Sequence, residues 1–330
     1  MSDMLLLPRE ARRDIAAGLD APQARWLVDY YYAVQDYRIQ AAGQARAVAQ
    51  DADQGTVELA AHVAGNMETI ESEIQKALGE YAMTHVPGQW ALAQHGIGPV
   101  LSAGLLAHID IEKAPTVGHI WRFAGLDPSV KWLSRAAVDT IVKDVHPGKG
   151  NVTEAEFVLI AERFPNLTAD KIVSRLANHP KGPKTPTVKN VQAACALRPW
   201  NASLKVLCWK IGDSFVKQSG SDKCVYGHIY RARKEQEVAF NNEGRFADQA
   251  AKSLVERNIK DKDLRVCYEA GRLPDGRIDL RARRYAVKLF LSHLHFVMFE
   301  DRFGEPPPKP YVLTVEGGHA HFIAPPHWPL

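Results

Sequence analysis

Two long stretches near the start of the chain carry apolar residues at spacings of three and four. The repeating positions are Trp26, Tyr30, Val34 and Tyr37 in residues 22–50, and Leu59, Val63, Met67, Ile70, Ile74 and Leu78 in residues 56–83. Such spacing puts the apolar side chains on one face of an α-helix. We therefore expect two helices joined near residues 51–55. They form either an antiparallel pair within the chain or a coiled-coil seam between two copies.

Helical patterns also cover most of the remaining sequence. Thr153 with Glu156 matches a capping box, which predicts a helix that ends near Phe164. Thr168 can cap a second helix over residues 169–178. Further helices are expected over residues 189–218, 224–243, 244–268 and 279–303. The absence of alternating strands and helices argues against a nucleotide-binding parallel sheet.

The predicted fold class is therefore mainly α. It comprises a helical hairpin or coiled coil, then a helical domain that contains a helix-hairpin-helix, and a small β-hairpin at the C-terminus around Gly317 and Gly318. Five segments are expected: a helical hairpin over 1–88, a helix-hairpin-helix unit over 89–133, an inserted helical pair with basic linkers over 134–190, a basic helical part over 191–305, and a tail over 306–330.

The net charge of +3 hides an uneven distribution along the chain. Residues 1–90 carry 7 basic and 13 acidic side chains, whereas residues 181–300 carry 23 and 13. A split of this kind suggests a polyanionic partner for the basic part, or else packing of the acidic part on the basic part. The four cysteines form no CxxC pair, and no apolar run reaches the length of a membrane span or a secretory signal. We expect a cytoplasmic protein with no membrane contact.

The segment from His95 to Ile109 contains the sharpest local signal. Gly96, Ile97 and Gly98 form a tight turn, Pro99 follows in the first helical turn, and Val100 continues the helix. Glycines let the backbone approach a phosphate, and the N–H groups at the start of the next helix point at it. Small residues at 102–104 allow another helix to approach closely. The pattern predicts a helix-hairpin-helix, which binds the nucleic-acid backbone without reading bases.

Several blocks downstream strengthen this interpretation. They are the aromatic and apolar run at 120–128 that ends in Ala-Gly-Leu-Asp-Pro, the Asn-Ala-Ser-Leu-Lys block at 201–205, the tyrosine-rich basic block at 226–234, and the block at 283–289. In this order the chain resembles the carboxy-terminal domain of insertion-sequence transposases of the IS-one-ten and IS-one-sixteen type. The resemblance covers roughly residues 57–133 and 191–300. It implies a mobile-element context, DNA binding, and a link to transposition or recombination.

The sequence departs from that family at the positions that carry its chemistry. Family members begin with a ribonuclease-H-like domain whose acidic residues bind magnesium, whereas a helical pattern stands in its place here. The family also uses a serine in a glycine-containing stretch; Ser129 and Ser134 lie in the corresponding interval, but no glycine follows either. The two serines are therefore weak catalytic candidates, because a serine nucleophile needs an activating group beside it. No cofactor is expected, and Mg²⁺ enters only if the chain is an active recombinase.

Basic side chains of the later helices are the second set of candidate nucleic-acid contacts. Tyrosines interleave with them, and phosphate contacts combined with aromatic stacking suit nucleic acid. The candidates are Lys205, Arg231, Arg233, Lys234, Arg281, Arg283, Arg284 and Lys288. A solvated helix face is the alternative. The stretch 181–189 can act as a mobile basic linker that follows phosphates.

Two further groups of residues match known kinds of site. The helical pair at 153–178, with apolar Val158, Ile160, Ile172, Val173 and Leu176, could form a helix-turn-helix reader of DNA. The pairs His293/His295 and His319/His321, with Asp301, could bind zinc or manganese, but residues two apart on a helix point in different directions. We expect no metal site.

The sequence thus predicts a DNA-binding protein that resembles a transposase and lacks complete recombination chemistry by itself. RNA is an alternative partner, and a homodimer through the N-terminal helices is expected. Two other functions stay open: an active recombinase that uses a serine and metal-bound acids, and a helical scaffold or interaction protein.

Overall fold

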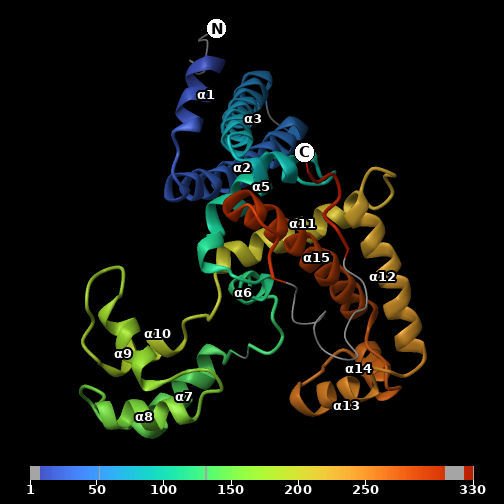
Figure 1. The fold of residues 1–330 in the computed structure, drawn as a ribbon. Helices are drawn as coiled ribbons and strands as arrows, with labels where there is room; N and C mark the ends of the chain where they lie inside the picture. The colour runs from blue at the N-terminus through green and yellow to red at the C-terminus, as the bar shows by residue number, and fades with distance from the viewer. Residues whose placement is uncertain (1–7, 52, 131, 309–322, 330) are drawn as a thin grey trace. The chain divides into compact units, whose positions relative to one another are not determined.

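The computed structural model describes residues 8–51, 53–130, 132–308 and 323–329, and this part of the chain is mainly helical (Figure 1). The expectation of a mainly α fold is confirmed. No strand forms within these residues, where a single antiparallel bridge joins Asn151 and Thr187. The predicted β-hairpin falls largely on residues 309–322 and so lies outside the described residues. No helix in the described ranges is long and apolar enough to cross a membrane.

The chain divides into two compact units. Unit 1 comprises residues 1–120 and 206–330, and unit 2 comprises residues 121–205. The sequence placed boundaries at 133/134 and 190/191, whereas the three-dimensional contacts place them at 120/121 and 205/206. Unit 1 is therefore built from two stretches that unit 2 separates along the chain.

The N-terminal part of unit 1 contains three helices, and two of them are long. They are α1 (Arg9–Ala17), α2 (Ala21–Asp51) and α3 (Gln54–Met83). Asp53 caps α3 by accepting a hydrogen bond from the Thr56 backbone N–H at 3.0 Å. Helices α2 and α3 pack on each other, and Tyr31 donates a hydrogen bond across them to the buried Glu71 at 2.9 Å.

The buried face of α2 is not the one that the spacing suggested. Trp26 and Tyr37 are 65% and 63% exposed, and Tyr30 is exposed as well. Of the predicted stripe only Val34 is buried, and the core of α2 is formed by Ala24, Val28, Tyr31 and Val34, which also follow one another at spacings of four and three. Both stripes satisfy helical periodicity, and the selection between them depends on which side α3 and α5 cover.

The segment for which the sequence predicts a helix-hairpin-helix follows directly. Its elements are α4 (Val86–Ala93), α5 (Pro99–His108), the short 3₁₀ helix η1 (Ile111–Lys113) and α6 (Val117–Phe123). The expected close approach at the small residues of α5 is confirmed, since a Cβ on Gly104 would lie 2.8 Å from Leu207 Cδ1. A larger residue at this position would require the Leu207 side chain of α11 (Ala202–Lys217) to shift.

The remaining helices complete unit 1. They are α12 (Val225–Asn242), α13 (Ala247–Glu256), α14 (Lys262–Glu269) and α15 (Asp275–Phe303). The single helix predicted over 244–268 is wrong, because residues 257–261 separate α13 from α14. The predicted burial of the later part of α15 is confirmed: Phe290 packs against the rings of Trp90, Phe215 and Tyr226.

Unit 2 has a hydrophobic core of its own. Its helices are α7 (Arg135–Val145), α8 (Glu154–Glu162), α9 (Ala169–Ala177) and α10 (Val188–Cys195). The predicted capping box at Thr153 and Glu156 and the Thr168 cap are confirmed. The continuous helix predicted over 189–218 is wrong: α10 ends at Cys195 and α11 starts at Ala202, with Pro199 between them.

Candidate nucleic-acid interface

The predicted hairpin turn lies between α4 and α5 and is held from a distant part of the chain. Gly96 has a φ of +98°, a conformation that side chains rarely adopt, so glycine is required there. Ser214 of α11 donates a hydrogen bond to the Gly96 carbonyl at 2.6 Å. Gln218 contacts the His95 ring at 3.0 Å, and the Cys224 thiol donates to the His95 carbonyl at 3.4 Å. The turn is therefore fixed by α11, by the residue that follows it and by the residue that precedes α12.

The turn presents backbone rather than side chains. Ile97 and Val100 are buried, so their side chains anchor the turn to the core. Gly98 is the N-cap of α5, has no side-chain cap, and has no atom within 4 Å of the position of a Cβ. Pro99 has no N–H to satisfy. The other N–H groups of the first turn lack intrahelical acceptors, and the positive end of the helix dipole adds to their attraction for an anion.

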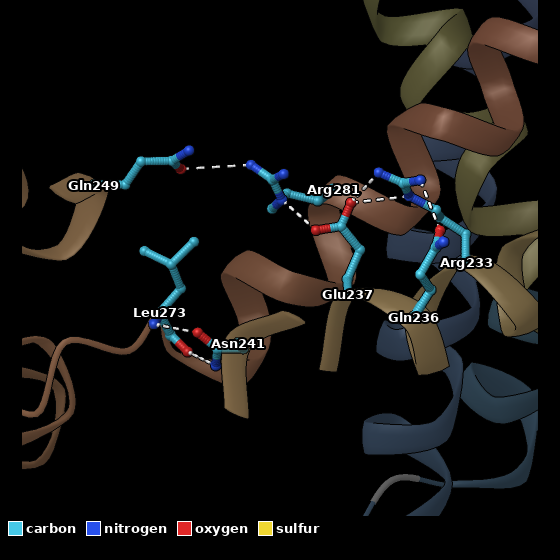
Figure 2. Close-up of polar contacts among 7 residues, drawn as sticks. All are labelled: Arg233, Gln236, Glu237, Asn241, Gln249, Leu273 and Arg281. Atoms are coloured by element: carbon cyan, nitrogen blue, oxygen red, sulfur yellow. Dashed lines mark hydrogen bonds and ion pairs between the residues drawn. The ribbon is translucent and has the colours of Figure 1, made fainter. Parts of the chain in front are cut away.

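The basic residues of α12 and α15 are arranged differently from the prediction. Figure 2 shows Glu237 between Arg233 and Arg281, and its side chain is only 2% exposed. Arg233 Nε donates to Glu237 Oε1 at 2.9 Å, and Arg281 Nε donates to Oε2 at 2.6 Å. Next to this site, Asn241 exchanges two hydrogen bonds with the Leu273 backbone. The pair of Glu237 with Arg281 thus joins α12 to α15, whereas Arg233 pairs with Glu237 within α12.

Asp279 organises a second ionic cluster on the same pair of helices. Its carboxylate pairs with Lys234 at 2.9 Å and with Arg283 at 2.6 Å, and Tyr230 donates a further hydrogen bond. Burial opposes ionisation of this carboxyl group, but the donors outweigh burial and keep the pKa of Asp279 below its usual value. Four of the eight predicted basic contacts therefore already have carboxylate partners, which weakens their role as phosphate ligands.

The other four predicted cations have different surroundings. Arg231 and Arg284 are exposed, and Arg231 donates to the Ser219 carbonyl at 3.2 Å. Lys288 is half-buried on α15. Lys205, which ends unit 2, places its ammonium 4.0 Å from the centre of the Trp200 ring. Arg231 and Arg284 are thus the exposed predicted cations of the two helices.

Both candidate serines have local structural roles. The backbone N–H and the hydroxyl of Ser129 donate to Asp127 Oδ1 at 2.9 and 2.7 Å. Ser134 caps α7 by accepting from the Ala137 N–H. These contacts are typical of a turn and of a helix cap.

The helical histidines belong to the core. His293 contacts the Tyr226 hydroxyl at 2.8 Å and the Ile323 carbonyl at 3.0 Å, while His295 contacts the Ala114 carbonyl. Burial lowers the pKa of His293 to about 4, so the ring is neutral at pH 7. No group of three metal-ligating side chains occurs in the ranges that the structure describes, and His319 and His321 lie outside those ranges.

Sequence reasoning missed the partners of these sites. Ser214, Gln218 and Cys224 lie more than 100 residues from the turn that they hold, and no local pattern identifies them. Glu237 could have been found from its spacing, because a carboxylate four residues after Arg233 forms a favourable helical pair.

Comparisons with protein-family models, with curated proteins and with solved structures find no match to this chain.

Proposed function

We propose that this chain is a DNA-binding protein that contacts the phosphate backbone through the turn at residues 94–98. The observation that carries the proposal is the start of α5 at Gly98, where no side chain caps the helix and open space surrounds the position of a Cβ; N–H groups at such a helix start attract anions. Contacts from Ser214 of α11, from Gln218 directly after it and from Cys224 before α12 hold this turn, so little conformational entropy is lost when a phosphate binds. Arg231 and Arg284 are the proposed supporting cations.

The proposed role is binding without complete recombination chemistry. Ser129 and Ser134 stabilise a turn and a helix start, which supports a structural role for both. The resemblance of the motif order to transposases supports DNA as the partner. RNA is the alternative partner, and binding measurements with both nucleic acids distinguish the two. Mg²⁺ would be needed only for the recombinase alternative.

We also propose that two copies associate through the N-terminal helices. Trp26 and Tyr30 stack with their ring centres 5.5 Å apart on the exposed side of α2, and Tyr37 is exposed as well. Exposed aromatic residues of this kind are enriched at interfaces. Replacing Trp26 and Tyr37 by Ala should convert a dimer to a monomer in light scattering after size exclusion. A wild-type chain that is monomeric at high concentration would exclude this assembly.

A cytoplasmic location is proposed because all four cysteines are free in the structure. Reduced thiols are the usual state of cysteine in that compartment.

Equilibrium binding to a fluorescent DNA duplex tests the proposed function. We expect the logarithm of the affinity to fall linearly with the logarithm of salt concentration, and the affinity to be similar for unrelated sequences. The same titration with an RNA duplex distinguishes the two nucleic acids. Absence of binding at 50 mM salt, or an affinity that does not change with salt, would overturn the proposal.

A further inference from the structure

Unit 2 carries an excess of positive charge, whereas the rest of the chain carries an excess of negative charge. Residues 121–205 carry 13 Lys and Arg and 7 Asp and Glu, a balance of +6. The rest of the chain carries 28 basic and 31 acidic side chains, a balance of −3, and the two values add to the total of +3. Much of the basic character that the sequence placed on α12 and α15 is neutralised there, whereas unit 2 keeps its excess.

Two basic loops of unit 2, far apart in the sequence, lie side by side. We call residues 146–151 and 178–190 the basic loop pair, and the second segment includes the first three residues of α10. The bridge between Asn151 and Thr187 joins them, and the Val152 N–H donates to the Pro186 carbonyl at 2.8 Å. The sequence did not indicate that these two loops meet, because 27 positions separate Asn151 from Asn178.

The charges of the loop pair are all of one sign. It contains Lys149, Lys181, Lys184 and Lys189 and has no Asp or Glu. None of the four lysines forms an ion pair within the described residues, and all except the half-buried Lys184 are exposed. The neighbouring carboxylate, Glu156, is occupied: it accepts from the Thr153 N–H at 2.7 Å and contacts His146 at 2.9 Å.

The backbone of the loop pair is also accessible. Gly150 and Gly182 have φ values of +140° and +86°, and no atom lies within 4 Å of where either would carry a Cβ. The loops contain no aromatic residue, and Val188 is their one aliphatic residue larger than proline. A surface that inserts into a lipid headgroup layer needs apolar side chains. Cations on open, polar backbone suit a phosphodiester chain better.

We propose that the basic loop pair is a second phosphate-binding surface, through which unit 2 contacts the nucleic-acid backbone independently of the hairpin turn. This inference rests on the proposed DNA-binding function and extends it to a part of the chain outside the helix-hairpin-helix. Because the contacts are with phosphate, the surface adds affinity and salt dependence without adding sequence preference.

The experiment compares two charge-matched double variants of the full chain. Lys149→Ala with Lys181→Ala removes two charges from the loop pair. Lys143→Ala with Lys171→Ala removes two exposed charges from α7 and α9 of the same unit. Each phosphate contact contributes about 0.9 to the salt slope on duplex DNA. In the loop variant, the slope of the logarithm of affinity against the logarithm of salt concentration should therefore be smaller by about 1.8, and the affinity at 0.1 M salt should fall by up to about 60-fold. The control variant should show less than half of each change.

The possible outcomes separate the two proposals. Equal losses in both double variants, or no loss in the loop variant, overturn the loop proposal and leave the hairpin contact intact. No duplex binding by the wild-type chain overturns both. Loss in the loop variant together with unchanged binding by a Gly98→Asp variant supports the loop pair and overturns the hairpin. Loss of binding to phosphatidylserine vesicles alone, with DNA affinity retained, assigns the loops to membranes and overturns the proposal.

Discussion

Replacing Gly98 by Asp is expected to stabilise α5 and weaken DNA binding at the same time. A Cβ at this position meets no atom within 4 Å, and the φ of −93° suits any residue. Aspartate is a better N-cap than glycine by a few tenths of a kcal/mol, and a negative charge at a helix N-terminus adds about 0.3–1 kcal/mol. Since 1 kcal/mol corresponds to roughly 2–4 °C in a chain of this size class, Tm should rise by about 1–3 °C.

The effect on binding has the opposite sign. The new carboxylate occupies the free N–H groups and stands about 5 Å from a bound phosphate, where repulsion costs about 1–3 kcal/mol at an effective dielectric constant between that of water and 20. This corresponds to a loss of about fivefold to 150-fold in affinity. The salt slope should also fall by about 0.9, for one lost phosphate contact.

Thermal unfolding and fluorescence anisotropy measure the two effects on the same samples. Gly98→Ala is the control for the added side chain, and Gly98→Asn caps the helix without charge. We expect the Ala variant to bind within about twofold of wild type, and the Asn variant to fall between Ala and Asp. Wild-type affinity in the Asp variant, with the expected rise in Tm, would refute the reasoning, because the fold would then be intact and the charge without effect.

Three further outcomes follow from the packing of unit 1. Glu237→Gln should lower the free energy of unfolding, measured in urea, by about 2 kcal/mol. This is less than the loss of a fully buried ion pair, because the two arginines that pair with Glu237 are partly exposed. An unchanged urea midpoint would contradict the bridging role of Glu237. Gly104→Ala should lower the free energy of unfolding by about 1–3 kcal/mol, because the new Cβ would lie 2.8 Å from the Leu207 side chain. Gly43→Ala places its Cβ in open space and should raise the free energy of unfolding by up to about 1 kcal/mol. The folded-state pKa of His293 lies below its unfolded value, so its contribution is present above about pH 6.5 and is lost as the pH falls towards 4. His293→Leu should therefore show a shallower loss of stability over this interval than wild type, and parallel pH profiles would contradict it.

Local sequence signals predicted the elements well where a few neighbouring residues decide the structure. The capping box at Thr153, the Thr168 cap and the Pro99 start of α5 each satisfy backbone donors within one turn. The prediction of one helix over 189–218 failed although a local signal was present, because Pro199 removes a backbone donor and ends the continuity between α10 and α11.

The sequence located the glycine turn but not the partners of the basic residues, for a physical reason. Gly96 and Gly98 were identified because backbone conformation and helix starts leave a signature in adjacent residues. The basic residues were identified by charge, but their carboxylate partners were overlooked. A lysine or arginine that pairs with Asp279 has the same residue type as one that faces solvent, so only the packing of the helices distinguishes the two.

The sequence by itself determined that this chain is helical, where most of its helices begin, and that a glycine turn precedes α5. Those features depend on interactions over a few residues. Only the tertiary structure decided which face of α2 is buried, which arginines are neutralised by Glu237, and that the loops at 146–151 and 178–190 meet. Burial and charge pairing depend on which surfaces come together across long stretches of chain, and helical periodicity is compatible with more than one such arrangement.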